Sequence, residues 1–359
     1  MIKKFLYPLY KYFTGFNVFQ YVTFRAAYAL VTALLISLVL GPWIIKKLKK
    51  WKIGQRIRHD GPPTHLTKSG TPTMGGVLLL LAVVVSIILW QDIDIQFTWI
   101  LLLALLGFGI IGFVDDYLKI TRKSAVGLRA ELKWIAQVGL SIAIAILLYS
   151  MGSKEVPLLY LPFLKEHIAN LGLFFIPFAV LVLLGASNAV NITDGLDGLA
   201  TGLILMVAIA FSVLAFVTDN IELSAHLNIP FVQNSGELSV ASLALVGACL
   251  GFLWFNAHPA EIMMGDTGSL ALGGMIGILA LILKKEILLF IIGGVFVIET
   301  GSVIIQVLYY KCTKKRVFKM APLHHHFELM GWKESKIVTR FWILGGLFAV
   351  LGLSTLKIQ

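Results

Sequence analysis

Long apolar runs dominate this chain and limit it to one fold class. Ten runs of about 17–25 residues have the length of a helix that crosses a bilayer. They lie near residues 22–45, 72–90, 97–114, 131–150, 171–187, 198–218, 239–257, 268–283, 287–309 and 338–356. The chain is 58% hydrophobic and only 14% charged, against about 25% charged in soluble domains. We therefore predict an all-α polytopic membrane protein whose single domain covers residues 1–359, with no room for a soluble domain.

The lysines and arginines predict how this domain lies in the membrane. Most of the 30 fall on alternate loops, at about 46–71, 115–130 and 310–337. The positive-inside rule places these loops in the cytoplasm and both termini outside. The loops at about 188–197 and 257–267 then also lie in the cytoplasm. Residues 1–20 read as an interfacial segment. The same distribution explains the net charge of +11 without a nucleic-acid partner, and the two cysteines, Cys249 and Cys312, predict neither a disulfide nor a metal site.

Polar clusters follow four of the runs, all on the predicted cytoplasmic side. Aspartates at membrane depth are costly and usually functional, and carboxylate oxygens together with phosphates are the ligands that Mg²⁺ prefers. We therefore predict a metal-dependent active site at the cytoplasmic surface. The clusters are Asp115-Asp116; Asn188, Asn191, Asp194 and Asp197; Asp266; and His324-His325-His326.

Each cluster also has a simpler interpretation. The aspartate pair would suit a solvated helix end, with Lys119 one turn further on the same face. Asp197 and Asp266 would suit helix N-caps. Three consecutive histidines cannot all point one way, so at most two share a site, as phosphate ligands or proton donors, or less readily as ligands of a transition metal. Glu299, inside the ninth run, is either functional or a protonated acid bonded to a neighbouring helix.

Five motifs in one order resemble a known family. They are Thr71-Pro72-Thr73-Met74-Gly75-Gly76, Phe113-Val114-Asp115-Asp116-Tyr117, Asn188-Ala189-Val190-Asn191 with Thr193-Asp194-Gly195-Leu196-Asp197-Gly198, Gly265-Asp266, and Ala321-Pro322 before the three histidines. The chain is similar, essentially end to end, to phospho-N-acetylmuramoyl-pentapeptide transferases of the polyprenyl-phosphate N-acetylhexosamine-1-phosphate transferase superfamily. The resemblance implies ten transmembrane helices in the bacterial cytoplasmic (inner) membrane, a homodimer, and Mg²⁺. It also implies a peptidoglycan-synthesis reaction in which UDP-MurNAc-pentapeptide and undecaprenyl phosphate give lipid I and UMP.

The resemblance also implies roles for individual residues. Asp266 and Asp116 would hold Mg²⁺, Asp115 would deprotonate or orient the lipid phosphate, and Lys119 and Lys133 would neutralise the phosphates. His324 and His325 would contact the sugar-phosphate side, and His326 would be structural. The predicted substrate-binding residues are Asn188, Asn191, Asp194, Gly195, Leu196, Asp197, Asn256, Met263, Lys68 and Thr73.

One position departs from the family pattern. Met263 stands where many relatives have a phenylalanine that would stack on uracil, and a thioether lacks a planar face. Two rival functions remain. A polyprenyl-phosphate N-acetylhexosamine-1-phosphate transferase would share the Asp-Asp pair and the metal. A transporter would place its acids near the bilayer midplane, between inverted repeats.

Overall fold

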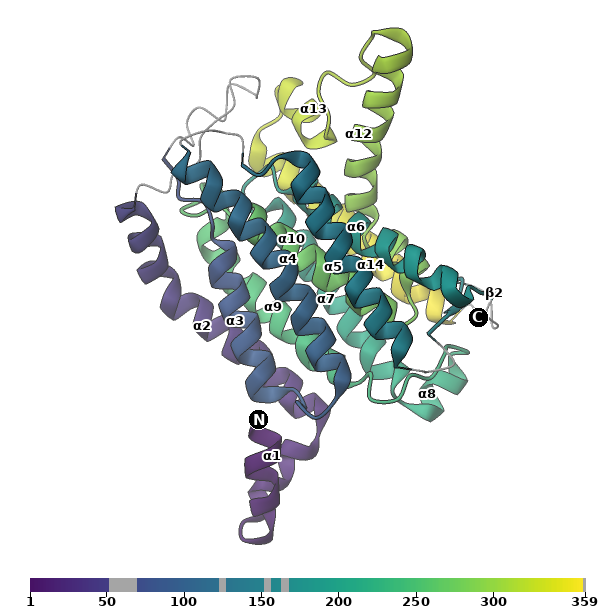
Figure 1. Cartoon of the computed structure of the whole chain (residues 1–359). Helices are drawn as coiled ribbons and strands as arrows, with labels where there is room; N and C mark the ends of the chain where they lie inside the picture. Colours follow the sequence, from purple (N-terminus) through teal and green to yellow (C-terminus); the bar gives the residue numbers. More distant parts are fainter. Residues whose placement is uncertain (52–69, 123–126, 152–155, 163–167, 358–359) are drawn as a thin grey trace.

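The predicted all-α fold is confirmed in a computed structural model (Figure 1). The structure describes residues 1–51, 70–122, 127–151, 156–162 and 168–357. Within these ranges the strands are limited to one antiparallel pair, β1 (Leu158–Leu159) and β2 (Ala169–Asn170). The α-helices are α1 (Ile2–Leu6), α2 (Val22–Lys50), α3 (Gly76–Trp90), α4 (Gln96–Thr121), α5 (Ala130–Ser150), α6 (Phe175–Thr193), α7 (Leu199–Thr218), α8 (Ile221–His226), α9 (Glu237–Asn256), α10 (Gly265–Ile282), α11 (Glu286–Ile292), α12 (Gly294–Thr313), α13 (Leu323–Leu329) and α14 (Glu334–Ser354).

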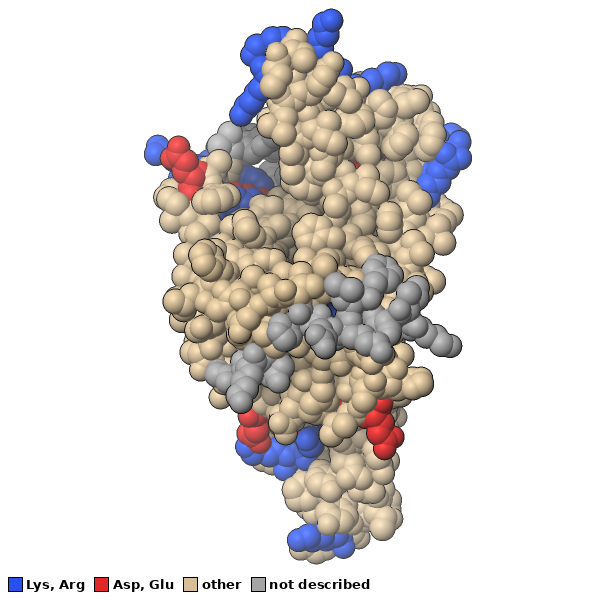
Figure 2. All heavy atoms as spheres, turned by 90° about the vertical axis from the view of Figure 1, so that its right-hand side faces the viewer, with Lys and Arg blue, Asp and Glu red and all other residues tan. Residues whose placement is uncertain are grey.

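The long helices fit a multi-pass membrane protein. In the part of the chain that the structure describes, nine segments are long and apolar enough to cross a bilayer, and α3 is a shorter apolar helix of 15 residues. Each of these ten helices overlaps one of the ten predicted runs. On the face that Figure 2 shows, most charged side chains of the described residues lie toward the two ends of the molecule, and the tan surface between them is largely uncharged. A lipid-facing surface has this distribution, because charged groups are costly in hydrocarbon.

Two helices form the centre of the bundle. In α10 and α9, 89% and 78% of the most apolar window is buried, against 28% in α5. Helix α10 packs against α4, α6 and α3, and α9 packs against α2 and α7. Small residues allow this close packing: a Cβ on Gly76 would overlap the backbone of Gly268, and one on Gly112 would overlap the carbonyl of Asp266. The helices that carry the acidic residues are therefore held backbone to backbone.

The boundaries of two predicted spans were wrong. The second span begins at Gly76 rather than residue 72, because residues 72–76 bond to another loop: Met263 N–H donates to Pro72 O at 2.8 Å, and Gly75 N–H donates to Met263 O at 2.8 Å. The ninth run, 287–309, forms two helices that meet at Gly293 and Gly294. Glycine has low helix propensity and is common at kinks, so adjacent glycines are a physical reason for the break.

Candidate active site

Three carboxylates from two helices meet at one end of the bundle. Asp115 and Asp116 lie in the last two turns of α4, and Asp266 lies in the first turn of α10. One oxygen of each lies within 4.8 Å of the others. Asp116 accepts hydrogen bonds from the Thr267 N–H at 2.9 Å and the Thr267 hydroxyl at 2.8 Å. The N-terminus of α10 thus fixes an anion in the way that helix N-termini commonly do.

Two lysines bridge these carboxylates. Lys119 Nζ lies 2.6 Å from Asp115 Oδ2 and 2.9 Å from Asp266 Oδ2. Lys133, from α5, lies 2.6 Å from the same oxygen of Asp266. Lys119 follows Asp115 by four residues, the spacing at which helical side chains share a face. Three acids and two lysines leave one net negative charge in a partly buried site, and this favours binding of a cation.

The donor set fits a small hard cation. Mg²⁺ is bound through one or two carboxylates, retains several waters and accepts substrate phosphates as further ligands. Asp115 and Asp116 are both 3% exposed, so their oxygens are largely shielded from bulk water. The other oxygen of Asp115 is held by the Leu128 N–H at 2.9 Å. Asp115, Asp116 and Asp266 could therefore hold a divalent ion through their carboxylate oxygens.

Helix α6 adds an amide and a further acid to this centre. The Asn191 amide donates to Asp266 Oδ1 at 3.0 Å and to the Ser269 hydroxyl at 2.8 Å. Asp194 directly follows α6 and accepts a hydrogen bond from the Gly265 backbone. Burial raises the pKa of Asp194 to about 7, and the charges of Asp266 and Asp116 act in the same direction.

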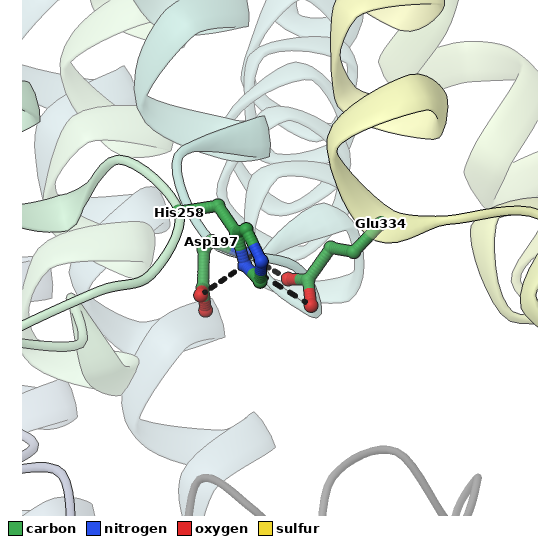
Figure 3. A group of neighbouring side chains, drawn as sticks. All are labelled: Asp197, His258 and Glu334. Atoms are coloured by element: carbon green, nitrogen blue, oxygen red, sulfur yellow. Dashed lines mark hydrogen bonds and ion pairs between the residues drawn. The ribbon is translucent and has the colours of Figure 1, made fainter.

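A second polar cluster lies on three other segments (Figure 3). His258 Nδ1 is 3.1 Å from Asp197 Oδ2 and 3.6 Å from Glu334 Oε2. Asp197 N–H donates to Glu334 Oε1 at 2.7 Å, and Ala260 N–H donates to Asp197 Oδ2 at 3.1 Å. These bonds join the loop after α6, the loop after α9 and the start of α14. The cluster thus fixes the position of two predicted substrate-binding loops.

The three histidines point to three different partners. His324 is fully buried, and its Nδ1 lies 3.2 Å from Glu299 Oε2 on α12. His325 Nδ1 lies 2.7 Å from Glu328, whereas His326 Nδ1 accepts the Lys319 N–H at 3.1 Å. The prediction that at most two share a site agrees with this arrangement.

His324 also faces the loop after α6. No group in the described part of the chain bonds to its Nε2, and a Cβ on Gly195 would overlap that atom. This histidine therefore connects the α12–α13 region with the loop that carries Asp194 and Asp197.

Comparisons with known proteins identify the family of this chain. The model of glycosyl transferase family 4 matches residues 98–284, and signature 1 of phospho-N-acetylmuramoyl-pentapeptide-transferases matches residues 68–80. The phospho-N-acetylmuramoyl-pentapeptide-transferase of Borreliella burgdorferi strain B31 is 51% identical over 349 residues, 97% of this chain and 99% of the relative. Those of Syntrophus aciditrophicus and Citrifermentans bemidjiense are 48% and 50% identical, each over 100% of both chains. The chain belongs to the phospho-N-acetylmuramoyl-pentapeptide-transferase family. It is a transferase and a multi-pass membrane protein.

Within this family member, the predicted site residues fall into separate groups. The structure brings together Asp115, Asp116, Asp266, Lys119, Lys133 and Asn191. Asn191 was predicted to bind substrate, and in the structure its amide donates to Asp266 Oδ1. Met263 and Thr73 lie on the paired segments beside Gly265. Lys68 lies outside the described residues.

Three other predicted substrate-binding residues contact neighbouring protein groups. Asn188 donates to Gln137 Oε1 at 2.8 Å. Asn256 accepts from the Thr201 hydroxyl at 2.8 Å and donates to Ile262 O at 2.9 Å. Leu196 is 2% exposed, so its side chain packs in the core. These contacts shape the loops around the acids. That the three side chains bind substrate stays a prediction.

Several polar residues of this region were missed by the sequence interpretation. Thr267 and Ser269 follow Asp266 within one turn and hold Asp116 and Asn191. The alternation of small polar residues after Gly265 was the available signal. His258 lies two residues after Asn256, but its partner Glu334 is remote in sequence, so no local pattern indicated the pair.

Proposed function

We propose that this chain transfers phospho-MurNAc-pentapeptide from UDP-MurNAc-pentapeptide to undecaprenyl phosphate, giving lipid I and UMP. The supporting observation is the cluster of three carboxylates and two lysines that α4, α5 and α10 assemble at the end of a membrane bundle. Phosphoryl transfer between two anions requires this charge balance, because catalysis is mostly positioning and electrostatic stabilisation. The names of relatives that match over the full chain support phospho-MurNAc-pentapeptide as the group that is transferred.

The reaction is an in-line displacement at phosphorus. A phosphate oxygen of the lipid attacks the β-phosphorus of the nucleotide sugar. The bond from that phosphorus to the bridging oxygen breaks, and UMP leaves with the electron pair. Asp115 orients or deprotonates the attacking phosphate, and Lys119 and Lys133 neutralise the anionic oxygens. We propose direct attack, since it needs no covalent intermediate.

Asp116 and Asp266 are the proposed ligands of Mg²⁺. When bound there, the ion supplies Lewis-acid stabilisation of the phosphate oxygens. The fit rests on the short separation of the carboxylates and on the preference of Mg²⁺ for oxygen ligands. The same acids are held by Thr267 and Asn191, so the site is arranged before the ion binds.

The positions of the loops around the acids suggest which of them bind the nucleotide and which bind the sugar of the donor substrate. Asp194, Gly195 and Asp197 lie on the loop after α6, which His324 and His258 contact from two directions. We propose that this loop, with the Met263 and Thr73 segments, binds the uridine nucleotide. His324 and His325 face the sugar-phosphate, and His326 is structural because it binds the Lys319 backbone.

We further propose that the site faces the cytoplasm of a bacterial inner membrane, with both termini on the opposite side. The lysine-rich loops predict this orientation. A homodimer is the expected assembly by family resemblance. The single-domain organisation over residues 1–359 remains part of this proposal.

The deciding experiment measures UMP release by the purified chain in detergent. The protein receives undecaprenyl phosphate and Mg²⁺ with either UDP-MurNAc-pentapeptide or UDP-GlcNAc. Release that requires the muramoyl donor, the lipid and the metal supports the proposal. Release from UDP-GlcNAc alone assigns the chain to the hexosamine branch. Folded protein that releases UMP from neither donor contradicts both, and a transport assay would follow.

A further inference from the structure

A buried charged cluster lies at the opposite end of α10 from Asp266. Lys284, Lys285 and Glu286 connect α10 to α11 and are 3%, 6% and 0% exposed. Helix α10 has 18 residues, so at about 1.5 Å per residue it separates this cluster from the carboxylates by about 27 Å. The cluster is therefore not part of the proposed active site.

Among the described residues, only one of the two lysines has a carboxylate partner. Lys284 Nζ lies 2.7 Å from Glu286 Oε1 and donates to Val156 O at 2.9 Å. It also lies 5.1 Å from the centre of the Phe175 ring. The single carboxylate of the cluster is thus already paired with Lys284.

Lys285 is the unbalanced cation. Among the residues that the structure describes, none accepts a hydrogen bond from its Nζ or forms an ion pair with it. Burial lowers the pKa of Lys285 to about 8, and the nearby Glu286 only partly opposes this shift. An anion bound at this largely buried ammonium would stabilise its charged form, because nearby opposite charge favours the ionised state.

Lys285 lines a small cavity that could admit part of an anion. The cavity has a volume of about 20 Å³ and is bordered by both lysines, Tyr160, Asn228, Leu288 and Thr355. This volume exceeds the roughly 10–15 Å³ that one water needs. Tyr160 is partly exposed, so the cavity borders the surface. Two lysines and one glutamate leave one positive charge beside it.

We propose that this cavity binds one singly charged phosphate group, either a lipid phosphodiester or free dihydrogen phosphate, through Lys285 Nζ. The anionic oxygen enters the cavity and accepts a hydrogen bond from the ammonium. The remainder of the group stays at the mouth, where Leu288 and Tyr160 offer an apolar edge. One bound monoanion neutralises the cluster. The proposal is independent of the transferase reaction.

The first test uses native mass spectrometry of the full, delipidated chain in detergent. Phosphatidylglycerol, which is singly anionic, is compared with zwitterionic phosphatidylcholine. Wild type is expected to bind one phosphatidylglycerol roughly tenfold more tightly than Lys285→Met, the size of a charge-assisted hydrogen bond. Lys11→Met makes the same charge change at an exposed position and should bind as wild type does. The affinity for phosphatidylcholine should be equal in all three.

A second arm distinguishes a free anion from a lipid. Inorganic phosphate that raises the Tm of wild type and Lys11→Met, but not of Lys285→Met, identifies free phosphate as the occupant. Selective phosphatidylglycerol binding without that shift identifies the lipid. Equal behaviour of wild type and Lys285→Met in both arms overturns the proposal.

A measurement on wild type alone covers the case in which Lys285→Met does not fold. Acylation of Lys285 by an amine-reactive ester is followed by peptide mass spectrometry, with Lys11 as internal reference. Phosphatidylglycerol or phosphate should slow acylation of Lys285 relative to Lys11. An unchanged ratio with both anions overturns the proposal.

Discussion

At the residue scale, the charge balance around Asp266 decides the chemistry. Asp266 Oδ2 contacts both lysines, and its Oδ1 is held by Asn191. Changing an aspartate to asparagine preserves the shape of the side chain but removes the charge that a metal needs. We expect Asp115→Asn, Asp116→Asn and Asp266→Asn each to lower UMP release by about 100-fold or more, which corresponds to a few kcal/mol of transition-state stabilisation.

Asp94→Asn is the matched control for these three variants. Asp94 is exposed and pairs with Lys4, and exposed ion pairs contribute little. Its turnover should equal that of wild type. Near-normal turnover of Asp115→Asn, Asp116→Asn or Asp266→Asn, at an unchanged Tm, would remove that residue from the proposed mechanism.

Gly195 gives a second test at this scale. A methyl group here would overlap His324 Nε2, and His324 is fixed on its other side by Glu299. Because the histidine cannot retreat, the loop of Asp194 and Asp197 must shift. We expect Gly195→Ala to lower UMP release at least tenfold, since small displacements of substrate-positioning groups are costly. Gly185→Ala on α6 has open space around its Cβ, so its turnover should be unchanged; equal losses in the two variants would contradict the steric argument.

Some residues of the candidate site could be predicted from the sequence, whereas some of their contacts could not. The Asp-Asp pair, Asp266 and Lys119 were found because acids are rare in apolar runs and because helical spacing relates Asp115 to Lys119. The partner of Glu299 could not be read from the sequence, because the 25 residues to His324 cross a helix end and a loop. The bond between Asn191 and Asp266 depends on the packing of α6 against α10, which no local pattern encodes.

At the element scale, helix positions depend on glycines where backbones meet. Gly112 on α4 faces the Asp266 carbonyl and the Thr267 nitrogen, and a Cβ there would overlap both. Backbone atoms cannot move aside as a flexible side chain can. Gly112→Ala should therefore separate the start of α10 from α4, lower UMP release by about 100-fold and reduce stability by roughly 1–3 kcal/mol.

Two measurements check this prediction, UMP release and the Tm in detergent. Gly139→Ala on α5 is the control, because its Cβ would meet nothing within 4 Å. That variant should keep full activity and gain slight helix stability. If Gly112→Ala matched Gly139→Ala in both measurements, the close approach of α4 and α10 would not position the acids.

The positions of the helices could be predicted from the sequence more accurately than their ends. Run lengths located all ten apolar segments, because a bilayer imposes a length on each. The start of α3 and the break between α11 and α12 were misplaced. Residues 72–76 bond to Met263 and Met264, far away in the chain, and the glycine pair at 293–294 lies inside an otherwise apolar run.

At the scale of the whole molecule, the protein has two chemically different ends. One carries the carboxylates, the histidines and the end of α12, whereas α1 lies at the other (Figure 1). The Asp266 end and the Lys285 end of α10 thus face different compartments in the proposed orientation. A bound anion at Lys285 would act far from the phosphoryl transfer, on the assembly or its lipid surroundings.

Cys312, the exposed native cysteine, can test this orientation directly. Cys312 is exposed in the last turn of α12, and Cys249 is buried in α9. A membrane-impermeant maleimide should label Cys312 in inside-out vesicles but not in intact spheroplasts. Thr14, exposed near α1, should give the reverse pattern as Thr14→Cys in a Cys312→Ser background. Labelling of Cys312 in sealed spheroplasts, with no signal from Cys312→Ser, would invert the topology and place the carboxylates on the side away from cytoplasmic nucleotide sugars.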